Sequence, residues 1–289
     1  MNFTFSYYNI SASQCYLYKP AETLLRFFSL LKKQRKNKNF MRIFFFNRII
    51  LVCVCFSLLL FGCDKEDPIV RDNPYNGKIT AVFNPDKKYG KVTDVDGNVY
   101  KTIVIGNQTW MAENLRTTHF RNGESIPNIT DSTEWATFAT GIYCNYNNTT
   151  NVDTIATYGR LYNWYAAADS RNIAPEGWRV PDINDWNILI EYLGGDTIAS
   201  DKLKEKGNLH WEDAYKSDNS SGFTALPTGQ RDRSDGNFDQ GVSFYSVWWS
   251  SSEYNETSAG FLFLFYFSSN VNKGINNKHN GYSIRCIKE

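Results

Sequence analysis

The side chains most able to do chemistry are few and widely spaced in this sequence of 289 residues. It has three histidines, His119, His210 and His279, without the close spacing that metal ligands show. We interpret them as solvated side chains. The Gly-x-Ser-x-Gly motif, which exposes the nucleophile of many hydrolases, does not occur.

Clusters of carboxylates and amides give a second group of candidates. Asp94, Asp96 and Asn98 carry the oxygen ligands that Ca²⁺ prefers, but the distal Glu of an EF-hand loop does not follow at its fixed spacing. Turn chemistry explains them better. Asp232 and Asp235 are close enough in sequence for glycoside hydrolysis, yet nothing distinguishes them from solvated loop carboxylates. The sequence therefore predicts no metal, no cofactor and no enzyme.

Charge divides the chain into two unlike parts. Of the 31 basic and 30 acidic residues, nine basic residues and one acidic residue precede Cys63. The remainder carries 22 basic and 29 acidic residues, a net charge of −7. An acidic chain without clustered Lys and Arg is a poor partner for phosphate backbones. We expect no nucleic-acid partner.

The segment 41–62 resembles a bacterial lipoprotein signal peptide. Arg42 and Arg48 precede an apolar run from Ile49 to Phe61, which is shorter than the 18 or so residues that span a bilayer. The run ends in Leu-Phe-Gly before Cys63 and is similar to the lipobox that directs acylation of a cysteine. The resemblance implies a lipid anchor on Cys63 in the outer membrane. An ordinary signal peptide is the alternative.

Residues 1–40 do not fit this pattern, because a signal peptide should begin the chain. We expect translation to start at Met41. Residues 63–89 are polar and contain Pro68, Pro74 and Pro85, which predicts a tether. Asp64 to Pro68 also resembles a signal that sends lipoproteins to the cell surface in Bacteroidetes-like bacteria, although a plain linker is an equal alternative.

Only two cysteines remain after Cys63 in the mature chain, Cys144 and Cys286. In an oxidising compartment such a pair predicts a disulfide. Two buried free thiols are the alternative.

Residues 90–289 form the expected domain. Alternation around Asp96-Gly97 predicts a β-hairpin, and Gly106-Asn107 predicts a second turn before a strand at 108–111. Helices are expected at 159–169 and, after the N-cap Asp182, as far as Gly194. Short strands are expected at 223–227, 247–251 and 282–287. The run AGFLFLFYF at 259–267 predicts a buried central strand. Polar loops separate these last segments.

Six motifs then occur in one order. They are GKVTDVDGNVYKTIVIGNQTWMAENL at 90–115, YGRLYNWYAA at 158–167, APEGWRVPDINDWNILIEYLGG at 174–195, SGFTALPTGQR at 221–231, VWWSSSE at 247–253 and GYSIRCIK at 281–288. Together they resemble the Fibrobacter succinogenes major paralogous domain, which is common in exported lipoproteins. Relatives often carry a cysteine where this chain has Ala174, which makes the pairing of Cys144 with Cys286 less ambiguous.

The resemblance extends to fold and function. The GWRVP segment and the closing Arg-Cys strand are similar to the C-type-lectin-like fold, which implies a mixed α+β architecture with N-terminal β-hairpins, two helices and a long-loop β region. The tripeptides of the lectin calcium site are absent. We expect a binding or adhesion module for a glycan or a protein. Tyr143, Tyr146, Tyr245 and Tyr254 are candidate contact residues, with the core as their alternative place. An enzyme resembling formylglycine-generating enzymes and a structural envelope component are the alternative functions.

Overall fold

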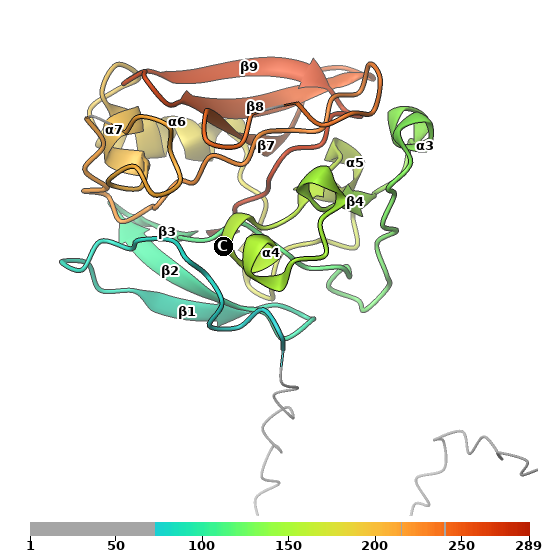
Figure 1. The fold of residues 1–289 in the computed structure, drawn as a ribbon, viewed down its shortest axis with the longest axis horizontal. Coiled ribbons are helices and arrows are strands. Elements are labelled where there is room, and N and C mark those ends of the chain that lie inside the picture. Colours follow the sequence, from blue (N-terminus) through green and yellow to red (C-terminus); the bar gives the residue numbers. More distant parts are fainter. Residues whose placement is uncertain (1–72, 215, 240) are drawn as a thin grey trace, which may run out of the picture. The chain divides into compact units, whose positions relative to one another are not determined.

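The computed structural model describes residues 73–214, 216–239 and 241–289 (Figure 1). The strands are β1 (Gly90–Thr93), β2 (Val99–Ile105), β3 (Gln108–Met111), β4 (Tyr143–Cys144), β5 (Leu161–Tyr162), β6 (Trp178–Arg179), β7 (Tyr245–Glu253), β8 (Ser258–Phe265), β9 (Val271–Asn277) and β10 (Ile287–Lys288). The helices are α3 (Ser132–Thr137), α4 (Val152–Tyr158), α5 (Trp164–Ala167), α6 (Ile183–Tyr192) and α7 (Ala199–Leu203), with a 3₁₀ turn η1 (Tyr146–Asn148). The expected α+β class is confirmed.

The first sheet is curled and antiparallel, in the order β1-β2-β3-β10-β6. Its first two strands form the predicted hairpin, and Gly97 adopts φ +78° in the turn, a conformation that glycine reaches without steric cost. The second predicted turn joins β2 to β3. Strand β10 lies between β3 and β6, so the last strand of the chain pairs with one of the first.

The second sheet has three antiparallel strands in the order β7-β8-β9 (Figure 1). Strand β7 includes the expected strand at 247–251, and β8 includes most of the expected apolar strand. Strand β9 was not expected, because its sequence VNKGINN is polar and was interpreted as loop. Its exposure explains that composition: β9 is an edge strand, and edge strands favour polar and charged side chains.

The expected helix after Asp182 is confirmed, and its N-terminus shows why it begins there. The Asp182 side chain accepts from the backbone N–H groups of Asn184 and Asp185, and the Asp185 side chain accepts from the N–H of Asp182. This capping box satisfies N–H groups that a helix leaves unpaired. The expected helix at 159–169 is wrong: β5 occupies its start, and α5 has four residues.

Buried arginines join the long loops to the core. Arg231 donates to the carbonyls of Ile129, Thr130 and Gly236 and lies against the rings of Trp135 and Phe238. Each such guanidinium satisfies several loop carbonyls at once. Three further arginines, Arg116, Arg160 and Arg285, are also buried and each lies over an aromatic ring.

The segment 73–89, expected to be tether, is bonded to the domain near both of its ends. Asn73 donates to the carbonyl of Asp96, and Asn84 donates to the carbonyl of Asn219. Residues 79–83 belong to none of the strands. Among the described residues, no helix combines the length and apolarity needed to cross a bilayer.

Candidate functional site

Strand β8 alternates between two kinds of apolar side chain, and the two faces differ in exposure. Leu262 and Leu264 are fully buried against the core that includes α6 and α7. On the opposite face, Phe261, Phe263 and Phe265 are partly exposed. Because successive side chains of a strand point to opposite faces, the Leu/Phe alternation gives β8 one fully buried face and one face that is only partly buried, against a second core cluster.

A strip of aromatic side chains, called here the aromatic row, consists of Tyr245, Phe261, Phe263, Phe265 and Phe267. Phe267 is exposed and the others are half-buried, with Tyr245, Phe261 and Phe263 packed in part against the core. Phe263 and Phe265 are 5.9 Å apart between centroids with planes within 18° of parallel. Tyr245 pairs with Phe265 across β7 and β8 and lies 5.1 Å from Phe263. Phe267 extends the strip beyond the end of β8, at 4.5 Å from Phe265, and 68% of its surface is exposed.

Edge strand β9 borders the row with a glycine and amides. Phe261 pairs with Gly274, where an added Cβ would lie 2.8 Å from the tip of the phenyl ring. The ring therefore leans across the sheet into space that only glycine leaves open. Asn272 is the partner of Phe263 in the register, and its side chain is exposed.

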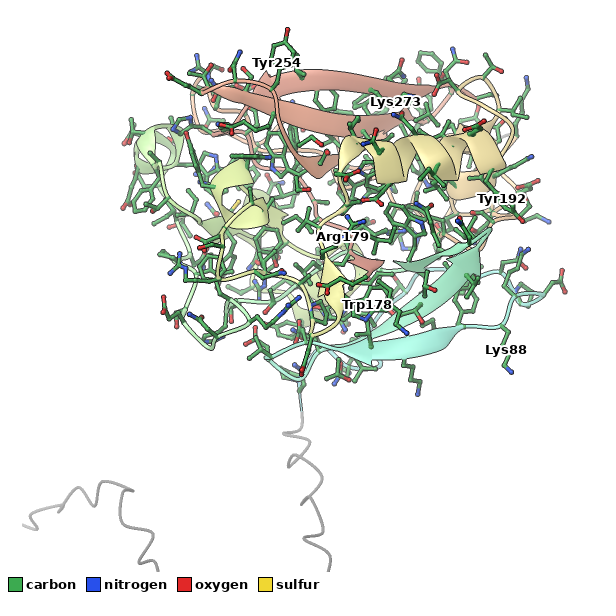
Figure 2. All side chains as sticks on the ribbon, turned by 180° about the vertical axis from the view of Figure 1, so that it is seen from behind. Lys88, Trp178, Arg179, Tyr192, Tyr254 and Lys273 are labelled. Atoms are coloured by element: carbon green, nitrogen blue, oxygen red, sulfur yellow. The ribbon has the colours of Figure 1, made fainter. Side chains whose placement is uncertain are left out.

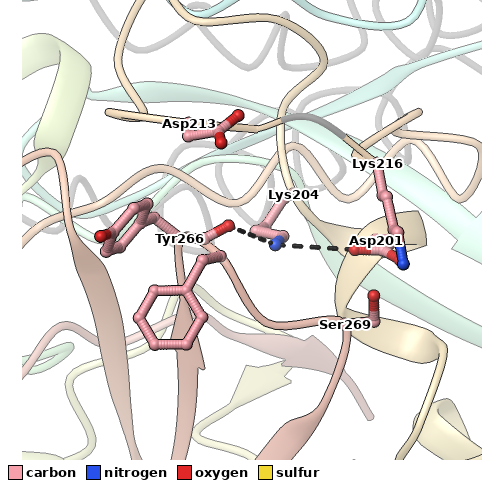
Figure 3. Close-up of a pocket in the computed structure, with 7 residues that line it drawn as sticks. Asp201, Lys204, Asp213, Lys216, Tyr266 and Ser269 are labelled. Atoms are coloured by element: carbon pink, nitrogen blue, oxygen red, sulfur yellow. Dashed lines mark hydrogen bonds and ion pairs between the residues drawn. The ribbon is translucent and has the colours of Figure 1, made fainter.

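A small pocket adjoins the far end of the row (Figure 3). It encloses about 70 Å³ and is too small for a whole organic cofactor. Its wall combines aromatic, charged and hydroxyl side chains: Asp201, Lys204, Asp213, Lys216, Tyr266, Phe267 and Ser269. Phe267 belongs to both the pocket and the row, so the two surfaces are continuous.

Lys204 is the most buried charge of this pocket. Its ammonium donates to the carbonyls of Tyr266 and Ser268 at 3.1 and 3.0 Å and lies 3.6 Å from a carboxylate oxygen of Asp201. Burial lowers its pKa, and the nearby Asp201 carboxylate opposes that shift. We conclude that Lys204 fixes the β8–β9 turn onto α7, since its three donors already have acceptors.

The candidate calcium ligands serve a turn, as the sequence predicts. The Asp94 carboxylate accepts from the N–H of Asn98 at 2.9 Å and from the hydroxyl of Tyr100 at 2.6 Å. Asp96 accepts from the hydroxyls of Thr117 and Thr118, both at 3.0 Å, and pairs with His119. Burial raises the pKa of Asp94, whereas at Asp96 these hydrogen bonds outweigh burial and lower the pKa. No group of three metal-ligating side chains occurs in the described ranges.

His210 departs from the expectation of a solvated side chain. It is buried, with Nδ1 2.7 Å from Glu205 Oε2 and Nε2 2.9 Å from the hydroxyl of Thr80. A carboxylate only accepts, so Nδ1–H of His210 donates to Glu205. Because Glu205 also accepts from the N–H of Val82, the pair fastens the segment 79–83 to the domain. His279 is partly exposed and bonded to Asn277.

The expected disulfide is absent, and both cysteines are buried free thiols. Cys144 lies in one core cluster with Trp135 and Leu161, whereas Cys286 lies in another with Met111 and Ile284. Burial raises the pKa of Cys144 to about 12 and also raises that of Cys286. Since the thiolate is the reactive form, neither group is suited to nucleophilic or redox chemistry.

The candidate tyrosines lie in different environments. Tyr143 is buried in the core, and Tyr146 is partly buried with its hydroxyl on the carbonyl of Asp239. Tyr254 is exposed and projects from the end of the sheet (Figure 2). Tyr245 alone belongs to the aromatic row. The candidate acids Asp232 and Asp235 accept from N–H groups of their own loop, as turn residues do. Cys63 and the expected leader lie outside the described residues.

The family model of the Fibrobacter succinogenes major domain matches residues 103–288. The chain belongs to this family. No curated protein and no solved structure matches the chain.

The match shows that the buried arginines Arg116, Arg160, Arg231 and Arg285, as well as the aromatic row, lie within the Fibrobacter succinogenes major domain. Of this row, the sequence predicted only Tyr245 as a contact residue, although it also holds a signal for the phenylalanines. The run AGFLFLFYF is apolar throughout, which favours a fully buried strand. Its alternation of Leu with the larger Phe was the sign that its two faces differ.

Proposed function

We propose that this chain is an exported lipoprotein, acylated at Cys63, whose domain is a non-catalytic binding or adhesion module at the outer membrane surface. The observation that carries the proposal is the aromatic row. Exposed aromatic side chains contribute large contact areas with little loss of conformational entropy, and they are enriched where proteins bind partners.

The surroundings of the row support contact as its role. Its rings are held by β8 and β7, so the surface is formed before a ligand arrives, and such preorganisation reduces the entropic cost of binding. The raised pKa values of the two thiols weigh against the alternative of a cysteine-dependent enzyme.

We also propose that the domain is a variant of the C-type-lectin-like fold. Pairing of the last strand, β10, with β3 supports this, because it brings the two ends of the domain together and leaves the middle of the chain to form loops. The long connection between α7 and β7 is of that kind.

Whole-cell adhesion tests the proposal. Cells producing the full-length wild type, Cys63→Ala or the double variant Phe265→Leu/Phe267→Leu would be applied to two separate coatings, mucin glycans released from their protein and a mixture of extracellular-matrix proteins. We expect the wild type to adhere to at least one coating and both variants to lose adhesion. A fatty-acid probe should label the wild type and the double variant, but not Cys63→Ala.

Tyr192→Leu provides a matched control. Tyr192 is 64% exposed at the end of α6, away from the row, so its loss should leave adhesion unchanged (Figure 2). Adhesion that survives the loss of the row would exclude it as the contact surface. A wild type that resists labelling as completely as Cys63→Ala would exclude the lipid anchor.

A further inference from the structure

We infer that the ligand of the aromatic row is an uncharged glycan chain, which lies along β8 with its sugar rings on the phenyl groups. This inference rests on the proposed binding function and names the class of partner. It rests on the extended shape of the row, the hydrogen-bonding groups beside it and the lack of charged side chains among its members.

The shape of the row favours an extended ligand. Phe261, Phe263 and Phe265 occupy alternate positions of β8, which repeat about every 7 Å along a strand, and Phe267 follows in the turn after it. The row is therefore extended and narrow, and the adjoining pocket encloses only about 70 Å³. A protein partner typically requires an anchor side chain buried in a central pocket. An extended chain of sugar rings fits this surface better than a protein partner does.

The Phe261 ring is oriented by its neighbours on two sides. Gly274 leaves room for the ring to lean over β9, and its other neighbour, Tyr282, meets it edge-on at 5.8 Å. The side of the sugar ring that carries its C–H groups is apolar, so it packs on an aromatic face, whose π system favours partly positive hydrogens.

Uncharged hydrogen-bonding groups lie beside the aromatic row. The Asn272 amide is exposed beside Phe263 and has no hydrogen bond within the part of the chain that the structure describes. An amide both donates and accepts, as a sugar hydroxyl does. At the other end, the Ser269 hydroxyl lines the pocket next to Phe267. Binding sites commonly combine an apolar platform with a few such polar groups.

The members of the row carry no charge. Lys273 of β9 points to the α6 side of the sheet, where it pairs with Asp196 and bonds to Asn187 (Figure 2). Lys204 is held by carbonyl groups, as described above. The row itself consists of apolar and tyrosine side chains, so it offers no ionic attraction to an acidic polysaccharide.

Affinity measurements on the full-length protein in detergent test the inference. The probes are four neutral polysaccharides (β-1,3-glucan, β-1,4-xylan, α-mannan and arabinogalactan) and one acidic polymer, polygalacturonate. We expect saturable binding to at least one neutral polymer, and none to polygalacturonate. Phe261→Leu, Phe265→Leu and Phe267→Leu should each weaken binding about fivefold, because leucine keeps the apolar volume but removes the ring face. Asn272→Ala should weaken it about threefold.

Tyr192→Leu should bind as the wild type does. Binding that is unchanged in the three Phe variants would overturn the inference, as would a preference for polygalacturonate. If no neutral polymer binds while adhesion to the protein coating still depends on Phe265 and Phe267, the glycan inference fails and the proposed binding function stands. If the variants of the row adhere to both coatings as the wild type does, the glycan inference and the proposed binding function are both wrong.

Discussion

The two sheets of the domain use their residues in opposite ways. In the curled N-terminal sheet, the carboxylates at the β1–β2 turn accept hydrogen bonds from backbone and hydroxyl groups of the protein itself. In the C-terminal sheet, Phe265 and Phe267 remain partly or largely exposed. The carboxylates, whose sequence pattern resembles a ligand site, stabilise a turn. The phenylalanines, whose sequence pattern predicts a buried strand, are partly open to solvent.

The difference shows how this fold compensates for its many loops. Long polar connections must find partners for their backbone groups, and buried arginines and aspartates supply these partners. The regular strands of the C-terminal sheet pair with one another through the ladder, so the side chains on the second face of β8 are not needed as partners for loop backbone groups. Phe261 and Phe263 on that face pack in part against the core, and the rest of the face remains open to solvent.

Removing the buried charge of Arg285 should lower the stability of the domain more than any other change considered. Arg285 is buried, donates to Asn114 and to the carbonyls of Phe223 and Thr224, and lies 4.2 Å from the Phe223 ring centroid. Arg285→Ala should lower the free energy of unfolding by about 4 kcal/mol, because it leaves buried acceptors unpaired and creates a cavity. Urea unfolding followed by tryptophan fluorescence measures this change.

Arg285→Met separates the two contributions. Methionine restores most of the volume without the donors, so about half of the loss, roughly 2 kcal/mol, should remain. A methionine variant as stable as the wild type would mean that Arg285 is not required as a donor, and the contrast between the sheets would weaken.

The next largest difference in stability is expected between truncations on the two faces of β8. Leu262 is fully buried, so Leu262→Ala should cost about 3 kcal/mol. Phe267 is 68% exposed, so Phe267→Ala should cost about 0.5 kcal/mol or less, although it removes a larger side chain. Parallel urea titrations compare the two variants.

Leu264→Ala is the matched repeat on the buried face. Leu264 is as completely buried as Leu262, so its truncation should cost about as much as Leu262→Ala does. Equal costs for Leu262→Ala and Phe267→Ala would show that the ring is part of the core, and that the aromatic row is not a free surface.

Local rules predicted those parts of the fold that local chemistry determines. The hairpin at Asp96-Gly97 and the helix after Asp182 were both predicted, because turn and capping chemistry act within a few residues. The expected helix at 159–169 failed because Tyr162 pairs with Tyr143 and Tyr282, which are distant in sequence. Such tertiary pairing overrides helical spacing. Strand β9 was not predicted because its sequence is polar, as a loop's is, and its pairing with β8 makes it a strand.

The candidate site was less predictable, because it depends on which face of a strand is covered. Composition identified AGFLFLFYF as apolar, but only packing against α6 and α7 shows that the Leu face is the covered one. The burial of His210 depends in part on Thr80, which is 130 residues away in the sequence, and no spacing rule brings the two together.

At the N-terminal turn, the expected loss of stability is smaller than that for truncating the buried leucines, and it depends on pH. Asp96→Asn keeps the shape of the side chain but removes its charge, so it should cost about 1–2 kcal/mol at pH 7 through weaker hydrogen bonds. The pKa of Asp96 is lowered in the folded state from its ordinary value of 3.8. The stabilisation is therefore fully present above that value and is lost as the pH falls through the lowered one. Urea titrations between pH 7 and pH 3 should show the deficit of the variant shrinking in acid.

Asp94→Asn should give the opposite slope, which makes it the control for Asp96→Asn. Burial raises the pKa of Asp94, so folding favours its protonated form, and the stability that this carboxyl contributes is lost as the pH rises through its raised value. The deficit of Asp94→Asn should accordingly be larger at pH 3 than at pH 7. Parallel slopes for the two variants would contradict the structure at this turn, because two carboxylates with pKa shifts of opposite sign cannot lose their stabilising effect in the same direction.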